Sequence, residues 1–241
     1  MVRHDAPVSE RVVVVTGSRG GIGGAITDRF SANGDVVIGV DLLDGFDVTD
    51  ADGCAAKTAS IVSEHGRIDV LCNNAGIGAI GDAVAATPDD WSRVFAVNVF
   101  GVANMCRAVL PVMRAAGRGA VVNTCSVVAL VGLVDRAVYS ASKGAVLALT
   151  RALAADEVGH GIRVNCVSPG TVSSPWVERL AAAQDDPAAT LEALRRRQPL
   201  GRMVSCEEVA AAVAYLADDT TFTTGADFLL DGGITGIRLV Q

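Results

Sequence analysis

The sequence has few aromatic residues and few histidines, and its cysteines are scattered. Only 4% of the 241 residues are Phe, Trp or Tyr, although 50% are hydrophobic, so an aliphatic core is predicted. The three histidines lie far apart, and none of the six cysteines belongs to a C-x-x-C pair. This pattern gives no metal site and no disulfide framework, and it favours reduced, buried thiols.

Positive charge is also scarce. Twenty Lys and Arg residues stand against 27 Asp and Glu residues, which gives a formal charge of −7. Because nucleic acids and anionic membranes attract clustered basic residues, this balance argues against both as partners. The longest uncharged stretch, 119–134, has 16 residues and is too short and too polar to cross a bilayer. No apolar segment follows a basic start at the N-terminus, so the sequence indicates a cytoplasmic protein.

Short apolar segments alternate with longer helical patterns along the chain. Repeated strand–helix–strand units with short connections predict an α/β fold, a doubly wound Rossmann-type domain with a parallel sheet flanked by helices. Near-continuous apolar runs, typical of strands covered on both faces, occupy 11–16, 35–40, 69–73, 120–124, 162–167 and 227–230. Helical patterns occupy 21–32, 50–65, 88–115, 138–159 and 206–216.

One region interrupts this alternation. Residues 175–199 are helical in composition and follow the predicted strand 162–167, at the edge where open α/β sheets bind ligands. We expect this region to be a small helical substrate lid, the alternative being a plain surface insertion. No linker rich in Pro, Gly or Ser divides the chain, so 1–241 is predicted to be a single domain with an N-terminal extension at 1–9.

A glycine-rich turn, Thr16-Gly-Ser-Arg-Gly-Gly-Ile-Gly23, follows the first predicted strand and opens the first predicted helix. Glycines at such a turn let the backbone approach a pyrophosphate, and the helix N-terminus attracts the anion. The spacing is G-x-x-x-G-x-G, and its place between strand and helix predicts a dinucleotide-binding domain. The expected contacts are Gly17, Ser18, Arg19, Gly21, Ile22 and Gly23.

An acidic residue, Asp41, ends the second predicted strand. A carboxylate at this place accepts hydrogen bonds from the adenosine ribose and repels a 2′-phosphate, which favours NAD over NADP. The alternative is a solvated loop residue, but the position of Asp41 directly after the strand favours the ribose contact. Arg19 in the glycine turn works against the NAD preference, because a guanidinium attracts a 2′-phosphate.

The chain has only two tyrosines and two lysines, yet Tyr139 and Lys143 are four residues apart. On a helix this spacing places both side chains on one face. A phenol has a pKa of about 10, and a nearby ammonium favours the phenolate that a general base needs. Ser126 follows the predicted strand 120–124, where its hydroxyl could polarise a carbonyl or hold an alcohol.

These motifs, together with Asn73-Asn74-Ala75-Gly76 and Pro169-Gly170, resemble the short-chain dehydrogenase/reductase (SDR) family over nearly the whole chain. The resemblance implies that Tyr139 is the general acid/base. It implies that Lys143 lowers the pKa of Tyr139 and holds the nicotinamide ribose, and that Ser126 positions the substrate oxygen. Asn98 would hold a water that links Lys143 to solvent, a role that is compatible with Asn98 as a helix-kink residue.

The resemblance also implies further cofactor contacts. The pair 47–48 would contact the adenine, 74–76 would line the adenosine side of the cleft, and 169–172 would face the nicotinamide. Family members that use NADP often carry a basic residue directly before the second glycine of the turn. Here that residue is Gly20, which again favours NAD. The cofactor contacts that the resemblance implies beyond the glycine turn are Asp47, Val48, Asn74, Ala75, Gly76, Tyr139, Lys143, Pro169, Gly170, Thr171 and Val172.

The family implies an NAD-dependent oxidoreductase that transfers a hydride between the nicotinamide and a secondary alcohol or ketone. The segments 169–176 and 197–202 are also similar to dehydrogenases of fucose-type sugars and 2-keto-3-deoxy sugar acids, which points to a sugar or keto sugar acid. One alternative is a 3-oxoacyl carrier-protein reductase that uses NADPH. Another is a dinucleotide-binding sensor without catalysis.

Three further expectations concern assembly and the lid. The family implies a homotetramer, joined through the predicted helices 88–115 and 138–159. Arg195, Arg196 and Arg197 could contact a substrate carboxylate, although a solvated helix face accounts for at least two of them. Trp176 could pack over the nicotinamide or substrate, or it could anchor the lid.

Overall fold

A computed structural model describes residues 10–238, and the predicted extension 1–9 lies outside the described residues. Six parallel strands form one sheet, as the sequence predicts, and their order is β2-β1-β3-β4-β5-β8. The strand order reverses between β1 and β3, which opens a crevice at the carboxyl ends of these strands. The strands are β1 (Val12–Thr16), β2 (Val36–Val40), β3 (Val70–Asn73), β4 (Gly119–Thr124), β5 (Ile162–Pro169) and β8 (Asp227–Leu230).

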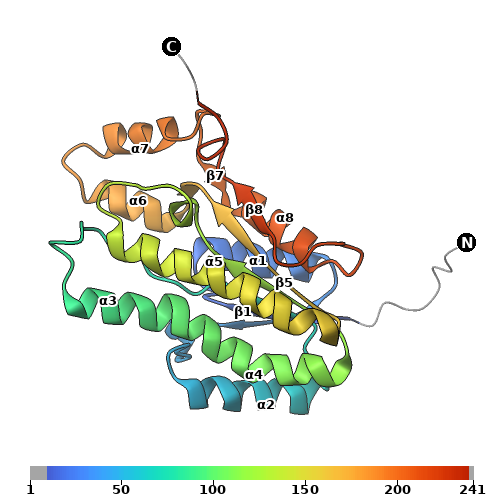
Figure 1. Cartoon of the computed structure of the whole chain (residues 1–241). Coiled ribbons are helices and arrows are strands. Elements are labelled where there is room, and N and C mark those ends of the chain that lie inside the picture. Colours follow the sequence, from blue (N-terminus) through green and yellow to red (C-terminus); the bar gives the residue numbers. More distant parts are fainter. Residues whose placement is uncertain (1–9, 239–241) are drawn as a thin grey trace, which may run out of the picture.

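Helices cover both faces of the sheet, so the core has two layers (Figure 1). On one face, α1 (Gly21–Ala32) and α8 (Cys206–Ala217) pack on alternate strand residues, including Val13 and Val15. On the other face, Val12 and Val14 contact a layer of three helices. These helices are α2 (Ala51–His65), α4 (Gly101–Ala116) and α5 (Ala137–Glu157).

The predicted helix 88–115 is not a single regular helix. It consists of α3 (Pro88–Phe95), a π-helical turn η2 (Ala96–Phe100) and α4, and a capping box of Thr87 and Asp90 begins it. The whole segment, Pro88–Ala116, is long and apolar enough to span a membrane. In the structure its apolar side packs on the sheet, with Met105, Val109 and Met113 buried.

The region 175–199 forms a helical hairpin, α6 (Pro175–Ala182) and α7 (Pro187–Arg196), which is orange in Figure 1. Each helix begins with a proline behind a side-chain cap, which fixes both starts. A short parallel pair that the sequence analysis did not predict joins the two ends of the hairpin. It consists of β6 (Val172–Ser173) and β7 (Val204–Ser205).

Candidate active site

The predicted catalytic side chains meet where β4 ends and α5 begins. Ser126 follows β4 and caps a short 3₁₀ turn, η3 (Val127–Ala129), by accepting a hydrogen bond from the Val128 N–H. Tyr139 lies in the first turn of α5, and Lys143 follows one turn later on the same face. The ammonium of Lys143 lies 5.8 Å from the centre of the Tyr139 ring.

Lys143 is buried, and no carboxylate pairs with it among residues 10–238. Its Nζ donates to the carbonyl oxygen of Thr124 at 2.7 Å, which fixes the side chain at the end of β4. Burial lowers the pKa of Lys143 because the charged form loses hydration. Lys143 therefore loses its proton more readily than an exposed lysine does, while Thr124 holds it in place.

Burial raises the pKa of Tyr139 to about 12. The hydroxyl of Ser126 and the guanidinium of Arg136 act in the opposite direction, since both favour the phenolate. Arg136 was not among the residues that the sequence analysis selected. Its position directly before α5 and three residues before Tyr139 was a signal that could have found it.

Asn98 lies inside the π-helical turn and is fully buried. Its Oδ1 accepts from the Ile77 N–H at 2.8 Å, and its Nδ2 donates to the Ile77 carbonyl and to Ser142 Oγ, each at 3.0 Å. A Cβ built on Gly76 would lie 3.3 Å from Asn98 Oδ1 and 3.5 Å from Lys143 Nζ. The structure therefore brings Asn98 and Lys143 to the same side of the crevice.

The glycine turn fits a dinucleotide pyrophosphate. Gly17 has a left-handed φ of +66°, and a Cβ on Gly23 would lie 2.0 Å from the Gly17 carbonyl oxygen, so both positions need glycine. No side chain caps the N-terminus of α1, and its first turn has no acidic residue. By contrast, side chains cap α2, α3, α6, α7 and α8. The free N–H groups of α1 are suited to an anion.

The ends of β1 and β3 are tied together beneath this turn. Thr16 Oγ1 accepts from the N–H groups of Asn74 and Ala75, each at 3.0 Å. Asn74 Nδ2 donates to the carbonyls of Thr16 at 3.2 Å and Gly17 at 3.3 Å. Thr16, which the sequence analysis did not select as a site residue, therefore positions the predicted adenosine side of the crevice.

Asp41, at the end of β2, has both carboxylate oxygens engaged. They accept from the backbone N–H groups of Arg19 and Leu43, each at 2.9 Å, so Asp41 caps the 3₁₀ turn η1 (Leu42–Asp44). The side chain of Arg19 forms a two-point ion pair with Asp44, at 2.9 Å from Nε and 2.8 Å from Nη2. The sequence analysis weighed Arg19 against Asp41 alone and missed this second carboxylate.

The two predicted adenine contacts, Asp47 and Val48, follow the turn η1 in the chain. Asp47 Oδ1 accepts from the Thr49 N–H at 2.8 Å, and the buried Val48 packs against Gly101 at the start of α4. The carbonyl of Val48 accepts from Asn104 Nδ2 at 3.0 Å. These contacts hold the segment between η1 and α2 against the core.

The loop after β5 is held by a residue of the hairpin that the sequence analysis missed. Gln198 is 2% exposed, and its Oε1 accepts from the Thr171 N–H at 2.6 Å. Its Nε2 donates to the carbonyls of Leu194 and Arg195 in α7, at 2.9 and 3.4 Å. The end of α7 is thereby fixed to the predicted nicotinamide loop, Pro169–Val172. At the other end of the hairpin, Trp176 packs on Gly78 in the loop after β3.

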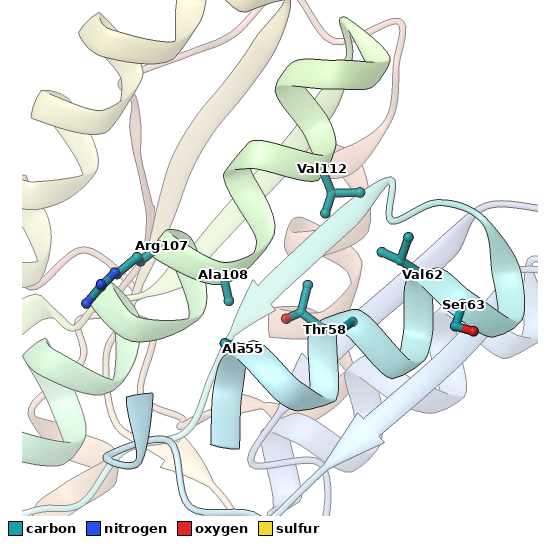
Figure 2. A pocket seen from close by; sticks show the side chains of 8 residues that line it. Ala55, Thr58, Val62, Ser63, Arg107, Ala108 and Val112 are labelled. Carbon is teal, nitrogen blue, oxygen red and sulfur yellow. The ribbon is translucent and has the colours of Figure 1, made fainter. Parts of the chain in front are cut away.

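A groove of about 570 Å³ lies elsewhere, between α2 and α4 (Figure 2). Small apolar side chains line much of it, and Arg107 lies at one end. It contains none of the predicted catalytic or cofactor-binding residues, so it is not part of the candidate active site. In the described part of the chain, no group of His, Cys, Asp or Glu could hold a metal ion.

A family model described as enoyl-(acyl carrier protein) reductase matches residues 38–235. A short-chain-type dehydrogenase/reductase of Sinorhizobium fredii is 38% identical over 92% of this chain, which spans 43% of that longer relative. The chain therefore belongs to the short-chain dehydrogenase/reductase family. It is an oxidoreductase that acts on CH–OH groups, as the sequence analysis predicted.

Several named relatives are sugar dehydrogenases. The chain is 38% identical to an L-fucose dehydrogenase of Mus musculus, over 93% of this chain and 88% of that one. It is 42% identical to a 2-keto-3-deoxy-L-fuconate dehydrogenase of Xanthomonas campestris pv. campestris, over 78% of this chain and 62% of that one. The predicted resemblance to both kinds of enzyme is confirmed.

Solved structures confirm the fold. The ligand-free aldohexose dehydrogenase of Thermoplasma acidophilum superposes with a TM-score of 0.89 at 31% identity, over 96% of each chain. An NAD⁺-bound xylitol dehydrogenase has a TM-score of 0.87 at 30% identity, over 95% of this chain and 100% of that one. ElxO with NADP bound has a TM-score of 0.87 at 25% identity, over 94% and 99%. The family binds NAD(P), and its members differ in which nucleotide they hold.

Proposed function

We propose that the protein is an NAD-dependent dehydrogenase of a secondary alcohol on a sugar or a keto sugar acid. The observation that carries this proposal is the meeting of Ser126, Tyr139, Lys143 and Asn98 at the end of the sheet where β3 and β4 end. The loop after β3 is tied through Asn74 to the glycine turn that precedes α1. The names of the relatives support the sugar or sugar acid. A 3-oxoacyl carrier-protein reductase would use NADPH, so nucleotide preference separates it from the proposed enzyme.

Each residue has a distinct task in this proposal. A bound nicotinamide supplies the hydride acceptor in oxidation and the hydride donor in reduction. Ser126 holds the substrate oxygen, and the Tyr139 hydroxyl takes the alcohol proton or returns it to the carbonyl. Lys143, fixed by Thr124, binds the nicotinamide ribose and exchanges protons with solvent through a water at Asn98.

The preference for NAD is supported by the carboxylates around Arg19. Asp41 would accept the ribose hydroxyl groups. Asp44 engages the guanidinium of Arg19 at two points, which leaves less positive charge for a 2′-phosphate. The remaining cofactor contacts are proposed as the sequence predicts them, from the glycine turn through 74–76 to 169–172.

Nucleotide binding tests this proposal. We expect NADH to bind at least about tenfold more tightly than NADPH, measured by nicotinamide fluorescence. Asp44→Asn should reduce that ratio about tenfold or more, because it frees Arg19 for the 2′-phosphate. Asp52→Asn, an exposed acidic residue in the first turn of α2, serves as the matched control.

Tighter binding of NADPH by the unmodified protein would contradict the NAD assignment and favour the carrier-protein alternative. A loss of NADH affinity in Asp44→Asn, without gain for NADPH, would show that Asp44 only shapes the turn. Failure to bind either nucleotide would contradict the enzyme mechanism proposed above.

We also propose that the α6–α7 hairpin is the substrate lid and that the chain acts in the cytoplasm.

We further propose that the chain forms a homotetramer joined through the helices 88–116 and 137–157. The expected mass in sedimentation equilibrium is four times the 24.6 kDa chain. Phe100, which is 60% exposed at the end of the π-helical turn η2, should contribute to this contact. Phe100→Ser should therefore shift the protein toward smaller species, and a monomeric unmodified protein would contradict the proposal.

A further inference from the structure

The amide of Gln198 lies buried between the helical hairpin and the end of the sheet. Only 2% of the residue is exposed. Its Oε1 accepts from the Thr171 N–H at 2.6 Å, and its Nε2 donates to the Leu194 carbonyl at 2.9 Å. These partners fix the orientation of the amide, since an N–H group needs its oxygen and a carbonyl needs its NH₂ group. One side chain therefore connects the loop after β5 to the last turn of α7.

Two glycines leave room for this side chain. A Cβ on Gly170 would lie 2.8 Å from Gln198 Oε1, and a Cβ on Gly232 would lie 3.0 Å from Gln198 Cβ. Gly232 also has a left-handed φ of +60° in the turn after β8. The backbone on both sides therefore packs directly against Gln198, and a larger residue at either glycine would displace it.

The loop after β5 is held at three points. The Gly170 N–H donates to the Leu230 carbonyl at 3.0 Å, and the Thr171 carbonyl accepts from the Val204 N–H at 3.1 Å. Both of these bonds join backbone to backbone. The third bond, at the Thr171 N–H, comes from the side chain of Gln198. Of the three, it is the one that a side-chain substitution can remove.

This loop begins beside the catalytic side chains. β4 and β5 are neighbours in the sheet, and Cys125, which follows β4, donates its N–H to the Val167 carbonyl at 2.8 Å. Ser126 is the next residue after Cys125, and the loop starts shortly after Val167. A nicotinamide that reacts with an alcohol held by Ser126 therefore lies close to the loop after β5.

Hydride transfer needs the nicotinamide ring and the substrate carbon in close contact, and a small misplacement lowers the rate steeply. We propose that Gln198 is a positioning residue for the nicotinamide, because its bond to the Thr171 N–H sets the place of the loop against which the ring lies. This inference rests on the proposed function and deepens it. Gln198 acts through the loop and has no contact with the reacting atoms.

The first test compares NADH with ADP-ribose, which has the adenosine, the pyrophosphate and the second ribose but no nicotinamide. Gln198→Met keeps an unbranched side chain of similar length and removes both amide groups. We expect it to weaken NADH binding by at least about tenfold, while the Kd of ADP-ribose changes by less than about threefold, both measured by calorimetric titration. Gln184→Met is the matched control and should change neither affinity, since Gln184 is exposed in the turn between α6 and α7.

Gln198→Glu makes a similar change reversible. The carboxylate still accepts from the Thr171 N–H, but it has no proton to donate to the Leu194 carbonyl. Burial beside a carbonyl oxygen raises the pKa of this carboxyl above its ordinary value of about 4.3. The protonated group restores the bond to Leu194 at low pH, and the bond is lost as the pH rises through the raised pKa. NADH affinity relative to the unmodified protein should therefore fall about tenfold between about pH 5.5 and 9.

Several results would overturn the positioning role. These are an unchanged NADH affinity in Gln198→Met, an equal loss for NADH and ADP-ribose, or a relative affinity of Gln198→Glu that does not fall as the pH rises. Equal affinities of the unmodified protein for NADH and ADP-ribose would also overturn it, since the loop would then hold no nicotinamide. Failure of the unmodified protein to bind either ligand would contradict the proposed dehydrogenase, and this inference with it. If Gln198→Met does not fold, Gln198→Glu at low pH decides the question.

Discussion

Tyr139→Phe is expected to lower kcat by roughly 10²- to 10⁴-fold, because it removes the hydroxyl that would exchange the substrate proton. The ring and its contact with Lys143 remain, so the Kd for NADH should change by less than about threefold. Steady-state kinetics and nicotinamide fluorescence measure the two effects. Tyr215→Phe is the matched control, since Tyr215 is the other tyrosine and lies more than half exposed on α8.

The pH dependence gives an independent check on the same residue. Burial raises the pKa of Tyr139 to about 12, so the phenol is protonated at neutral pH. Oxidation of an alcohol needs the phenolate, and kcat/KM for oxidation should therefore rise with pH below this pKa. Reduction needs the phenol and should not rise. Full turnover in Tyr139→Phe, or oxidation that slows as the pH increases, would contradict the general-base role.

Gly23→Ala is expected to destabilise the fold by roughly 1 to 3 kcal/mol and to lower NADH affinity by at least about tenfold. The new Cβ would lie 2.0 Å from the Gly17 carbonyl oxygen and 2.8 Å from Asn74 Nδ2. Relief of this overlap must push the glycine turn away from the end of β3 or move α1 along the sheet. Either movement displaces the N–H groups proposed to bind the pyrophosphate. Thermal unfolding and NADH titration measure the two consequences.

Gly24→Ala provides a control within the same helix. A Cβ at that position meets its nearest atom, the Ser18 carbonyl oxygen, at 3.7 Å, which is ordinary contact. Alanine is also the better helix former, so this variant should be stabilised or unchanged. If Gly23→Ala and Gly24→Ala behaved alike in stability and in NADH affinity, the close approach at Gly23 would not be a requirement of the site.

Local sequence patterns determined most of the fold. The apolar runs at 11–16 and 162–167 became central strands because near-continuous Val and Ile can be buried on both faces of a parallel sheet. The glycine turn, Asp41 and the pair Tyr139 and Lys143 were also visible. Sequence order places the glycine turn and Asp41 at the carboxyl ends of predicted strands, and the four-residue spacing places Tyr139 and Lys143 on one face of a helix.

A kink at Asn98 was considered, but the π-helical geometry of this turn was not visible in this way. The segment 88–115 has an unbroken helical pattern, and the irregularity depends on the hydrogen bonds between Asn98 and Ile77. These residues lie 21 positions apart and on different elements. Helical periodicity reports only which face is buried, so it carries no information about such a bond.

What the sequence determined by itself is the family, the Rossmann-type architecture and the candidate catalytic set, because each follows from neighbouring residues. Only the tertiary structure decided how distant charges and amides combine. It joined Arg19 to Asp44 and anchored Gln198 to Thr171. The physical reason is that Coulombic and hydrogen-bond energies depend on distance in space, which chain folding sets and sequence separation does not.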